Sequence, residues 1–233
     1  MGYKVDERMV AACRDALWDD ERVWWVIGGA CSGKSSVCRA IQRQTGVAVV
    51  DMDDEVYGGY GERLDPDRHP AMSTWFSVPD PFGWMLGMSL EAFEQVTRTI
   101  DIEMLSLFAE DMGRRAADAR MLVDGGLWHA SVVARVMPAR RVVCMATTPE
   151  RSAEVWASDK ERAEMRQSVQ SRPDGERLWR QWLAHGDASA SWTVRDSRAA
   201  GIAVIDTLAD GSAERSAERV REVFGWPNSV LQR

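Results

Sequence analysis

The sequence predicts an α/β fold in which a parallel β-sheet is covered by helices on both faces. Five short apolar runs rich in β-branched residues alternate with stretches of helical periodicity, a pattern typical of βα units joined into a parallel sheet. A glycine-rich stretch lies between the first apolar run and the helical pattern that follows it. The predicted strands cover approximately residues 22–27, 47–50, 121–123, 141–146 and 201–207.

The glycine-rich stretch, residues 28–35, fits the phosphate-binding template G-x-x-x-x-G-K-[ST]. Its glycines let the backbone turn so that successive N–H groups point at phosphate oxygens. Lys34 adds a positive charge to the outer phosphates, and the Ser35 hydroxyl can join the shell of Mg²⁺. The chain has only three lysines, and a helix expected at 33–44 would direct its N-terminus toward the same phosphates. The residues expected to bind the nucleotide are Gly28, Gly29, Ala30, Cys31, Ser32, Gly33, Lys34, Ser35 and Ser36.

Composition and charge exclude several functional classes. With 233 residues, 45% hydrophobic and 28% charged, the chain suits one soluble domain over 1–233. A net charge of −7 argues against nucleic acid as the main partner, and no apolar run reaches the ~20 residues of a membrane span. The polar N-terminus does not resemble a signal peptide, and the four cysteines lack metal-binding spacing. We therefore expect a cytoplasmic monomer or homodimer with reduced thiols that acts on a small molecule.

Acidic residues follow the second and third predicted strands. The second strand runs into Asp-Met-Asp-Asp at 51–54, and the third runs into Asp124 and two glycines. Ligands bind at the carboxyl ends of the strands in open α/β sheets, and an aspartate there beside a phosphate loop is typical of a Mg²⁺ contact. A solvated acidic turn is the alternative interpretation of 51–54. Carboxylates gathered at this edge, however, repel one another without a cation or a proton-donating substrate.

Residues 57–88 are predicted to be irregular, because glycine, proline and aromatic residues interrupt any periodicity. A structureless segment of this length is uncommon in a compact domain unless it is functional, so we interpret it as a substrate-binding segment or a lid. Trp75, Phe76 and Trp84 are candidate walls of the substrate site, and His69 could orient a phosphate or substrate. The alternative is that these aromatic residues pack the insertion down and that His69 is structural.

The remaining helices are predicted from apolar residues spaced three to four apart. A stripe that begins at Val5 predicts an amphipathic helix over 5–19, and Ser89 is the expected N-cap of a long helix that ends near 116. A polar helix is expected to follow residues 147–151 and to run through about 168, and further helices are expected at 174–184, at 189–199 and after Ser212.

The order of these motifs resembles the small P-loop kinases of the shikimate-kinase, nucleoside-monophosphate-kinase and zeta-toxin group. The resemblance is strongest at 28–36, moderate at 51–53 and 122–126, and weak elsewhere. It implies a three-layer P-loop NTPase fold with strand order 2-3-1-4-5, which puts Asp124 directly beside the phosphate loop. It also implies a substrate-binding insertion and helix over 57–117 and an arginine-bearing lid over 148–172.

The resemblance further implies ATP and Mg²⁺ as cofactors and assigns roles to individual residues. Lys34 would hold the phosphates, Ser35, Asp51 and Asp124 would organise Mg²⁺, and Asp53 or Asp51 would accept the proton of the substrate hydroxyl. The candidate substrate-binding residues are Asp53, His69, Trp75, Trp84, Gly125 and Gly126.

The lid departs from the pattern of the group. Trp156 stands where many relatives carry an arginine seven residues after the lid-helix proline. Arg162 and Arg166, four residues apart and therefore on one helix face, are the candidate lid arginines, which would neutralise charge during phosphoryl transfer.

We therefore expect a kinase that moves the γ-phosphoryl group of ATP to a hydroxyl of a small molecule of nucleoside, nucleotide, sugar or antibiotic type. An alternative is an NTP-hydrolysing switch or assembly ATPase without a small-molecule acceptor. A more remote alternative is a P-loop isopentenyltransferase, although Asp124 replaces the glycine usual in those enzymes.

Overall fold

The structure of the chain is a computed structural model that describes residues 2–115, 120–207 and 212–226. In these residues five parallel strands form one sheet in the order β2-β3-β1-β4-β5, which confirms the predicted fold class and strand order. The strands are β1 (Val23–Gly28), β2 (Ala48–Asp51), β3 (Met121–Asp124), β4 (Val142–Ala146) and β5 (Ala203–Asp206).

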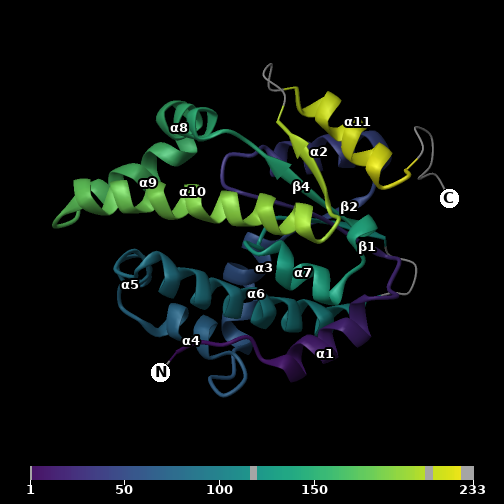
Figure 1. Ribbon diagram of the computed structural model, residues 1–233, viewed down its shortest axis with the longest axis horizontal. Helices are drawn as coiled ribbons and strands as arrows, with labels where there is room; N and C mark the ends of the chain where they lie inside the picture. Colours follow the sequence, from purple (N-terminus) through teal and green to yellow (C-terminus); the bar gives the residue numbers. More distant parts are fainter. Residues whose placement is uncertain (1, 116–119, 208–211, 227–233) are drawn as a thin grey trace.

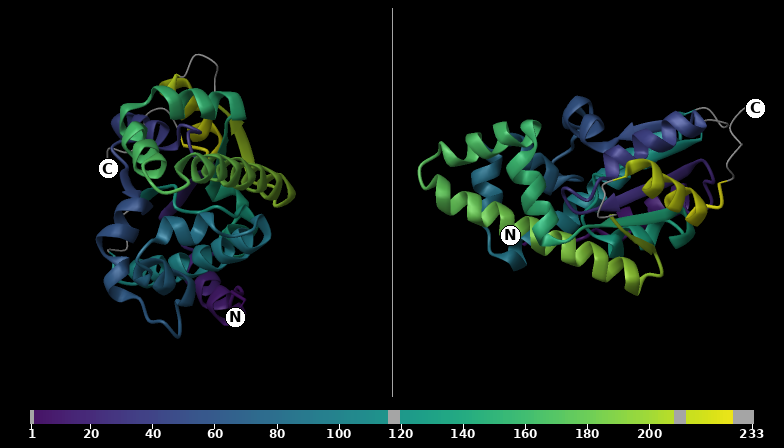
Figure 2. Two further views of the ribbon diagram at one scale, coloured as in Figure 1. Left: turned by 90° about the vertical axis from the view of Figure 1, so that its left-hand side faces the viewer. Right: turned by 90° about the horizontal axis from the view of Figure 1, so that it is seen from above.

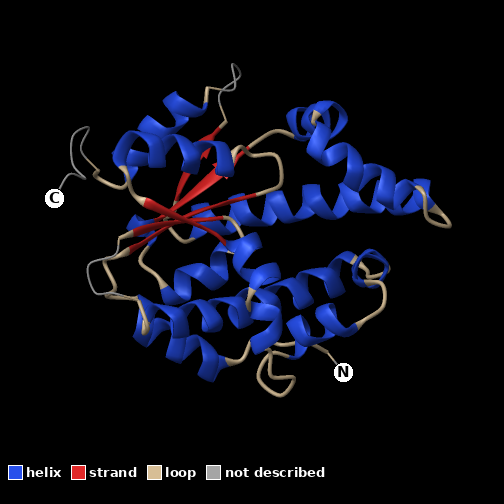
Figure 3. Ribbon diagram, turned by 180° about the vertical axis from the view of Figure 1, so that it is seen from behind, coloured by secondary structure: helices blue, strands red, loops and turns tan. Residues whose placement is uncertain are grey.

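Helices cover both faces of the sheet (Figure 1). The helices α2 (Lys34–Thr45) and α11 (Ala213–Val223) lie on one face, and α1 (Glu7–Leu17), α6 (Leu90–Met112) and α7 (Ala130–Val136) lie on the other. Figure 3 shows the same layers from behind, with the strands in the middle. Alternate residues of each strand point to opposite faces, so Val26 and Leu122 pack with α2 and α11 while Trp25 and Val123 enter the second, larger core.

The segment 57–88 is not irregular, as the sequence had suggested, but folds into short helices. They are α3 (Met52–Gly58), the 3₁₀ turn η1 (Tyr60–Arg63), α4 (Pro70–Ser77) and α5 (Pro81–Leu86). Prolines begin α4 and α5, where the missing backbone N–H costs nothing. The side chain of Asp80 caps α5 by accepting from the backbone N–H of Gly83 at 3.0 Å. The prolines were therefore helix starts rather than loop signals; residues 116 and 117, at the end of the predicted insertion, lie outside the described residues.

The C-terminal half contains α8 (Pro149–Ser158), α9 (Lys160–Gln170) and α10 (Gly175–Ala199). The two helices expected at 174–184 and 189–199 are one continuous helix, since Gly186 lowers helix stability without ending it. The paired helices α8 and α9, with the first part of α10, extend beyond the sheet (Figure 2). A separate small apolar cluster of Leu86, Val169 and Leu178 holds this extension together.

Other helix ends agree more closely with the sequence. Ser89 and Ser212 cap α6 and α11, as predicted, through their side-chain oxygens, while α6 ends at Met112 instead of near 116. A short 3₁₀ turn, η2 (Ala139–Arg141), precedes β4. Among the described helices, none has the length and apolar character needed to cross a membrane.

Two buried acids on α6 tie other segments to it. The Asp101 carboxylate accepts from the backbone N–H groups of Trp128 and His129, at 3.1 and 2.7 Å. The Glu103 carboxylate accepts from the first turn of α4, at Ala71 (3.0 Å) and Met72 (2.7 Å). Both side chains are almost completely buried, so these bonds replace the water that the carboxylates lose.

The Glu103 carboxyl should make stability depend on pH. Burial raises its pKa from 4.5 to about 7, against the two N–H groups that favour the charged form. The native state therefore binds a proton more tightly than the unfolded state, and stability falls by about 3 kcal/mol as the pH rises from 4.5 through 7.

Urea unfolding between pH 4.5 and 8 tests this expectation. The Glu103→Gln variant should be less stable overall at low pH, because its amide nitrogen faces a backbone donor, but should lack this decline. A variant whose stability falls with pH as steeply as that of the wild type would contradict the assignment.

Candidate active site

The loop between β1 and α2 is shaped by positions that favour glycine. Gly28 has a φ of +148°, and a Cβ there would overlap the carbonyl oxygen of Met145 on the neighbouring strand. Gly33, which precedes the first turn of α2, has a φ of +82°. Cys31 is held at a φ of +64°, which costs energy for a residue with a side chain. The sequence 28–33 thus forms a tight loop at the N-terminus of α2, the setting that suits phosphate oxygens.

The half-buried Lys34 lies over its own loop. Its Nζ donates to the carbonyl oxygen of Gly29 at 2.9 Å. Burial lowers the pKa of the Lys34 amino group, and the carboxylates of Asp124 and Asp53 oppose that shift. The lysine is thus held among groups of opposite charge, where it can bind an anion.

Asp51 and Asp124 end neighbouring strands and are directly paired in the sheet register. Asp51 also caps α3, because its Oδ1 accepts from the backbone N–H of Asp53 at 2.9 Å. Partial burial raises the pKa of Asp53, and the negative charge of Asp51 adds to the shift. The carboxylates that the sequence placed after two strands therefore lie together beside Lys34.

Asp124 has the features of a cation ligand. It is 4% exposed, and in the described part of the chain its Oδ1 has no hydrogen-bond partner. Burial raises the pKa of its carboxyl, against the hydrogen bond from Ser35 and the charge of Lys34. The described residues hold no cluster of three or more acidic, histidine or cysteine side chains that could bind a metal alone. One or two carboxylates completed by phosphates and water are, however, the usual ligands of Mg²⁺, so Ser35 and Asp124 fit this ion.

The glycines after Asp124 bring the β3 loop close to the phosphate loop. Gly125 and Gly126 have φ values of +69° and +77°. A Cβ on Gly125 would lie 3.3 Å from Cε of Lys34, and one on Gly126 would overlap Met52. A side chain at 125 would crowd Lys34, one at 126 would overlap Met52, and both positions need a backbone conformation that favours glycine.

Arg162 on α9 extends toward the phosphate loop. Its guanidinium carbon lies 4.7 Å from the ring centroid of Trp156. Its positive charge also lowers the pKa values of Cys31, Lys34 and Asp53, although burial is the largest influence on all three groups. Of the two candidate lid arginines, Arg162 is therefore the one whose charge acts on residues of the phosphate loop. Arg166 lies half-buried one helical turn further along α9.

The other substrate candidates lie in the helical insertion. His69 is fully buried; its Nδ1 accepts from the backbone N–H of Asp65 at 3.1 Å, and its Nε2 lies 3.2 Å from the Ser106 hydroxyl. Both ring nitrogens are thus engaged in holding the turn before α4 against α6. Trp84 packs against Tyr3 and Trp75, which agrees with the alternative that aromatic residues pack the insertion down.

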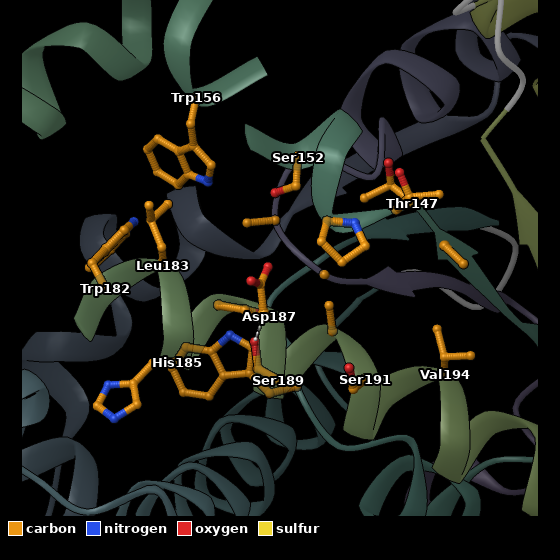
Figure 4. Close-up of a pocket in the computed structure, with 18 of the residues that line it drawn as sticks. Thr147, Ser152, Trp156, Trp182, Leu183, His185, Asp187, Ser189, Ser191 and Val194 are labelled. Carbon is orange, nitrogen blue, oxygen red and sulfur yellow. Dashed lines mark hydrogen bonds between the residues drawn. The ribbon is translucent and has the colours of Figure 1, made fainter. Parts of the chain in front are cut away.

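A pocket of about 710 Å³ lies next to the phosphate loop, and the sequence did not predict it. Gly29 and Ala30 form one border. Most of the other lining residues come from the end of β4 and the turn after it and from α5, α8 and α10, with Phe93 of α6, Trp128 and Asp206 in addition. Figure 4 shows the side chains of Thr147 and Ser152 on one side, Trp156 and Trp182 on another, and the Asp187 carboxylate between them. This volume lies within the range of small-molecule sites, roughly 300–1,000 Å³.

The sequence carried only a weak signal for this pocket. Trp182, His185 and Ser189 follow a helical spacing, which in isolation predicts a core-facing stripe. Asp187 interrupts the stripe, and no motif marks it.

Comparison with known proteins agrees with this architecture. No protein-family model matches the chain, and no curated protein sequence matches it. Among solved structures, the chain is similar to shikimate kinase from Acinetobacter baumannii in complex with shikimate, with 14% sequence identity and a TM-score of 0.50. The match covers 88% of this chain and 93% of that one. The fold is therefore that of the P-loop small-molecule kinases.

The contact between Gly29 and Ala190 should limit what either position accepts. A Cβ on Gly29 would lie 2.5 Å from the Cβ of Ala190 on α10. We expect Gly29→Ala to lower the free energy of unfolding by about 1–3 kcal/mol, as overpacking does. Ala190→Gly costs about 1 kcal/mol alone, and the double variant should be more stable than the sum of the two costs predicts.

Chemical unfolding of the four proteins measures this coupling. Gly186→Ala is the control on the same helix, because nothing lies within 4 Å of a Cβ there; it should not destabilise the fold. Strictly additive costs would show that α10 does not pack on the loop in this way.

Proposed function

We propose that the protein is an ATP-dependent kinase that phosphorylates a hydroxyl group of a small molecule. The observation that carries this proposal is the grouping of Lys34, Asp53 and Arg162 next to a pocket whose border includes the phosphate loop itself. The loop would bind the donor phosphates, and the pocket that it borders would hold the acceptor. The fold shared with shikimate kinase is consistent with this chemistry.

The proposed roles follow from charge and position. The backbone N–H groups of 28–33 and the Lys34 ammonium bind the donor phosphates. Ser35 and Asp124, with Asp51 beside them, would hold Mg²⁺, which when bound shields the negative charge of the phosphates. Such a site acts mainly through positioning and charge neutralisation.

Asp53 is the proposed proton acceptor. In the transfer, the acceptor oxygen forms a bond to the γ-phosphorus as the bond to the β,γ-bridging oxygen breaks, and the hydroxyl proton passes to the Asp53 carboxylate. ADP then leaves with the bridging oxygen. Asp51 is less suited to this role, because its Oδ1 is engaged by the backbone of α3.

The pocket favours a kinase over an NTP-hydrolysing switch. A switch needs a positioned water and a partner protein, and neither requires a pocket of about 710 Å³ beside the phosphate loop. An acceptor-dependent enzyme requires such a space. Release of ADP that depends on one pool of hydroxyl compounds would support the kinase; release indifferent to every pool would support the alternative.

Lys34 and Asp53 should separate binding from chemistry. Lys34→Ala is expected to abolish acceptor phosphorylation, because a full charge on the outer phosphates is lost. Asp53→Asn is expected to slow phosphorylation by about 10²- to 10⁴-fold, the usual contribution of a general base, while ATP affinity stays near that of the wild type.

Acceptor-dependent ADP release and equilibrium ATP binding measure the two effects, with thermal melts as the folding control. Phosphorylation at the normal rate in the Lys34 variant is the result that would rule out this mechanism.

The two candidate lid arginines should differ in effect. Arg162→Gln is expected to lower kcat by about 10-fold or more, because its charge acts on Lys34 and Asp53 and a lid arginine stabilises transferring charge. Arg166→Gln makes the same charge change one turn away on α9 and should have a smaller effect. Steady-state kinetics of both variants compares them, and equal losses would mean that Arg162 has no special position.

A further inference from the structure

We propose that the pocket beside the phosphate loop is the acceptor site and that it selects a hydroxyl compound with an aromatic or apolar body and a cationic amine. This inference rests on the proposed kinase function, since it names the substrate class of that site. Two observations carry it: the aromatic walls of the pocket and the position of Asp187.

The walls at one end of the pocket are largely apolar. They are built by Met85, Leu86, Phe93, Trp128, Trp156 and Trp182. His185 adds a further ring, stacked on Phe93 with a centroid distance of 4.4 Å, and burial lowers its pKa, so that the imidazole is neutral at pH 7. Rings of this kind favour a flat apolar body and also attract a cation to their faces.

Asp187 supplies the negative charge near these rings. It lies on α10 two residues after His185, and its carboxylate points into the pocket beside Ser189 and Ser152 (Figure 4). The side chain is exposed, and within the described residues no salt bridge holds its carboxylate. Its pKa is raised, first by the water lost where it borders the pocket and then by the negative charge of Glu150. A carboxylate at the pocket border that no arginine or lysine holds can pair with a cationic group of a ligand.

The arginines of the pocket lie at its other end. Arg195 and Arg198 follow Asp187 on α10 by eight and eleven residues, which corresponds to roughly 12 and 16 Å along a helix. Arg195 is engaged with Asp196, at 2.8 Å. Arg172, near the apolar end, is paired with Asp80 at 2.6 Å. An acceptor whose carboxylate lies among the aromatic rings would therefore meet Asp187, whereas Arg198 stands at the far end of the pocket.

The pocket is also placed for reaction. Its border residue Gly29 is the one whose carbonyl accepts from Lys34. Its wall residue Trp156 stacks with Arg162, whose charge reaches Asp53. In the proposed binding mode the acceptor presents its hydroxyl at the end bordered by Gly29 and Ala30, with its amine held toward Asp187.

Three matched probes test the selectivity directly: phenylethanolamine, 1-phenylethanol and mandelate. Each carries a benzene ring and a secondary hydroxyl, and the third substituent is cationic, neutral or anionic. Calorimetric titration in the presence of Mg·ADP should rank the amine tightest and mandelate weakest. Asp187→Asn should weaken amine binding by roughly two- to fivefold, the value of one accessible ion pair, and leave 1-phenylethanol unchanged.

The control variant is Glu154→Gln, which makes the same charge change on the adjacent helix α8, where Glu154 pairs with Arg151 outside the pocket. It should leave all three affinities unchanged. Trp182→Leu should weaken all three probes together. Mandelate binding as tightly as the amine, or an amine preference that survives Asp187→Asn, would overturn the inference.

Release of ADP from Mg·ATP with the same probes separates this inference from the kinase proposal. Amine-selective binding without acceptor-dependent ADP release would support the pocket chemistry and contradict the kinase function. Phosphorylation of mandelate, or of a hydroxy acid such as shikimate, in preference to the amine would support the kinase and overturn the inference.

Discussion

The close approach of α10 to the phosphate loop is the constraint on which the rest of the structure depends. Gly29 leaves no space for a side chain against Ala190, so the helix lies directly on the loop backbone. That contact supports a loop in which Cys31 is held at a positive φ, a conformation that is costly for a residue with a side chain. The same helix then continues outward beyond the sheet and carries one wall of the pocket. Loop geometry and acceptor space are thus set by one packing interaction.

Electrostatics at the sheet edge follows from the strand order. Because β3 lies between β1 and β2, Asp124 ends beside both the phosphate loop and Asp51. Burial raises the pKa values of Asp124 and Asp53 and lowers that of Lys34. Burial thus disfavours the charged form of all three groups. A bound polyanion would stabilise the charged form of Lys34, and a bound cation would stabilise the charged forms of Asp124 and Asp53. The site is poised for ligands of high charge without unusual side chains.

The sequence predicted the parts of this fold that are governed by local patterns. The phosphate loop and the Ser89 cap were each predicted from a short motif, and the strand order was predicted from the family resemblance. The pocket could not be predicted, because Asp187, Thr147 and Gly29 meet only through the path of α10 across the loop. The insertion was misjudged for a related reason: Pro70 and Pro81 begin helices that are stabilised by distant partners such as Glu103. The site roles inferred from the resemblance remain predictions.

A row of ring contacts joins the helices α4 and α5 to α10 and α8. Trp75 on α4 contacts Phe82 on α5 at 5.5 Å between centroids, Phe82 contacts Trp182 on α10 at 5.7 Å, and Trp182 contacts Trp156 on α8 at 5.7 Å. The wall of the pocket is therefore shared by segments that lie on either side of α10. Each edge or tilted contact stabilises by about 0.5–1.5 kcal/mol beyond burial, so a shift of α8 breaks or reforms contacts that reach Trp75. Trp156 also contacts Trp179, at 5.6 Å between centroids, and the Arg162 guanidinium lies over its ring. The ring contacts therefore connect Arg162 to the wall of the pocket.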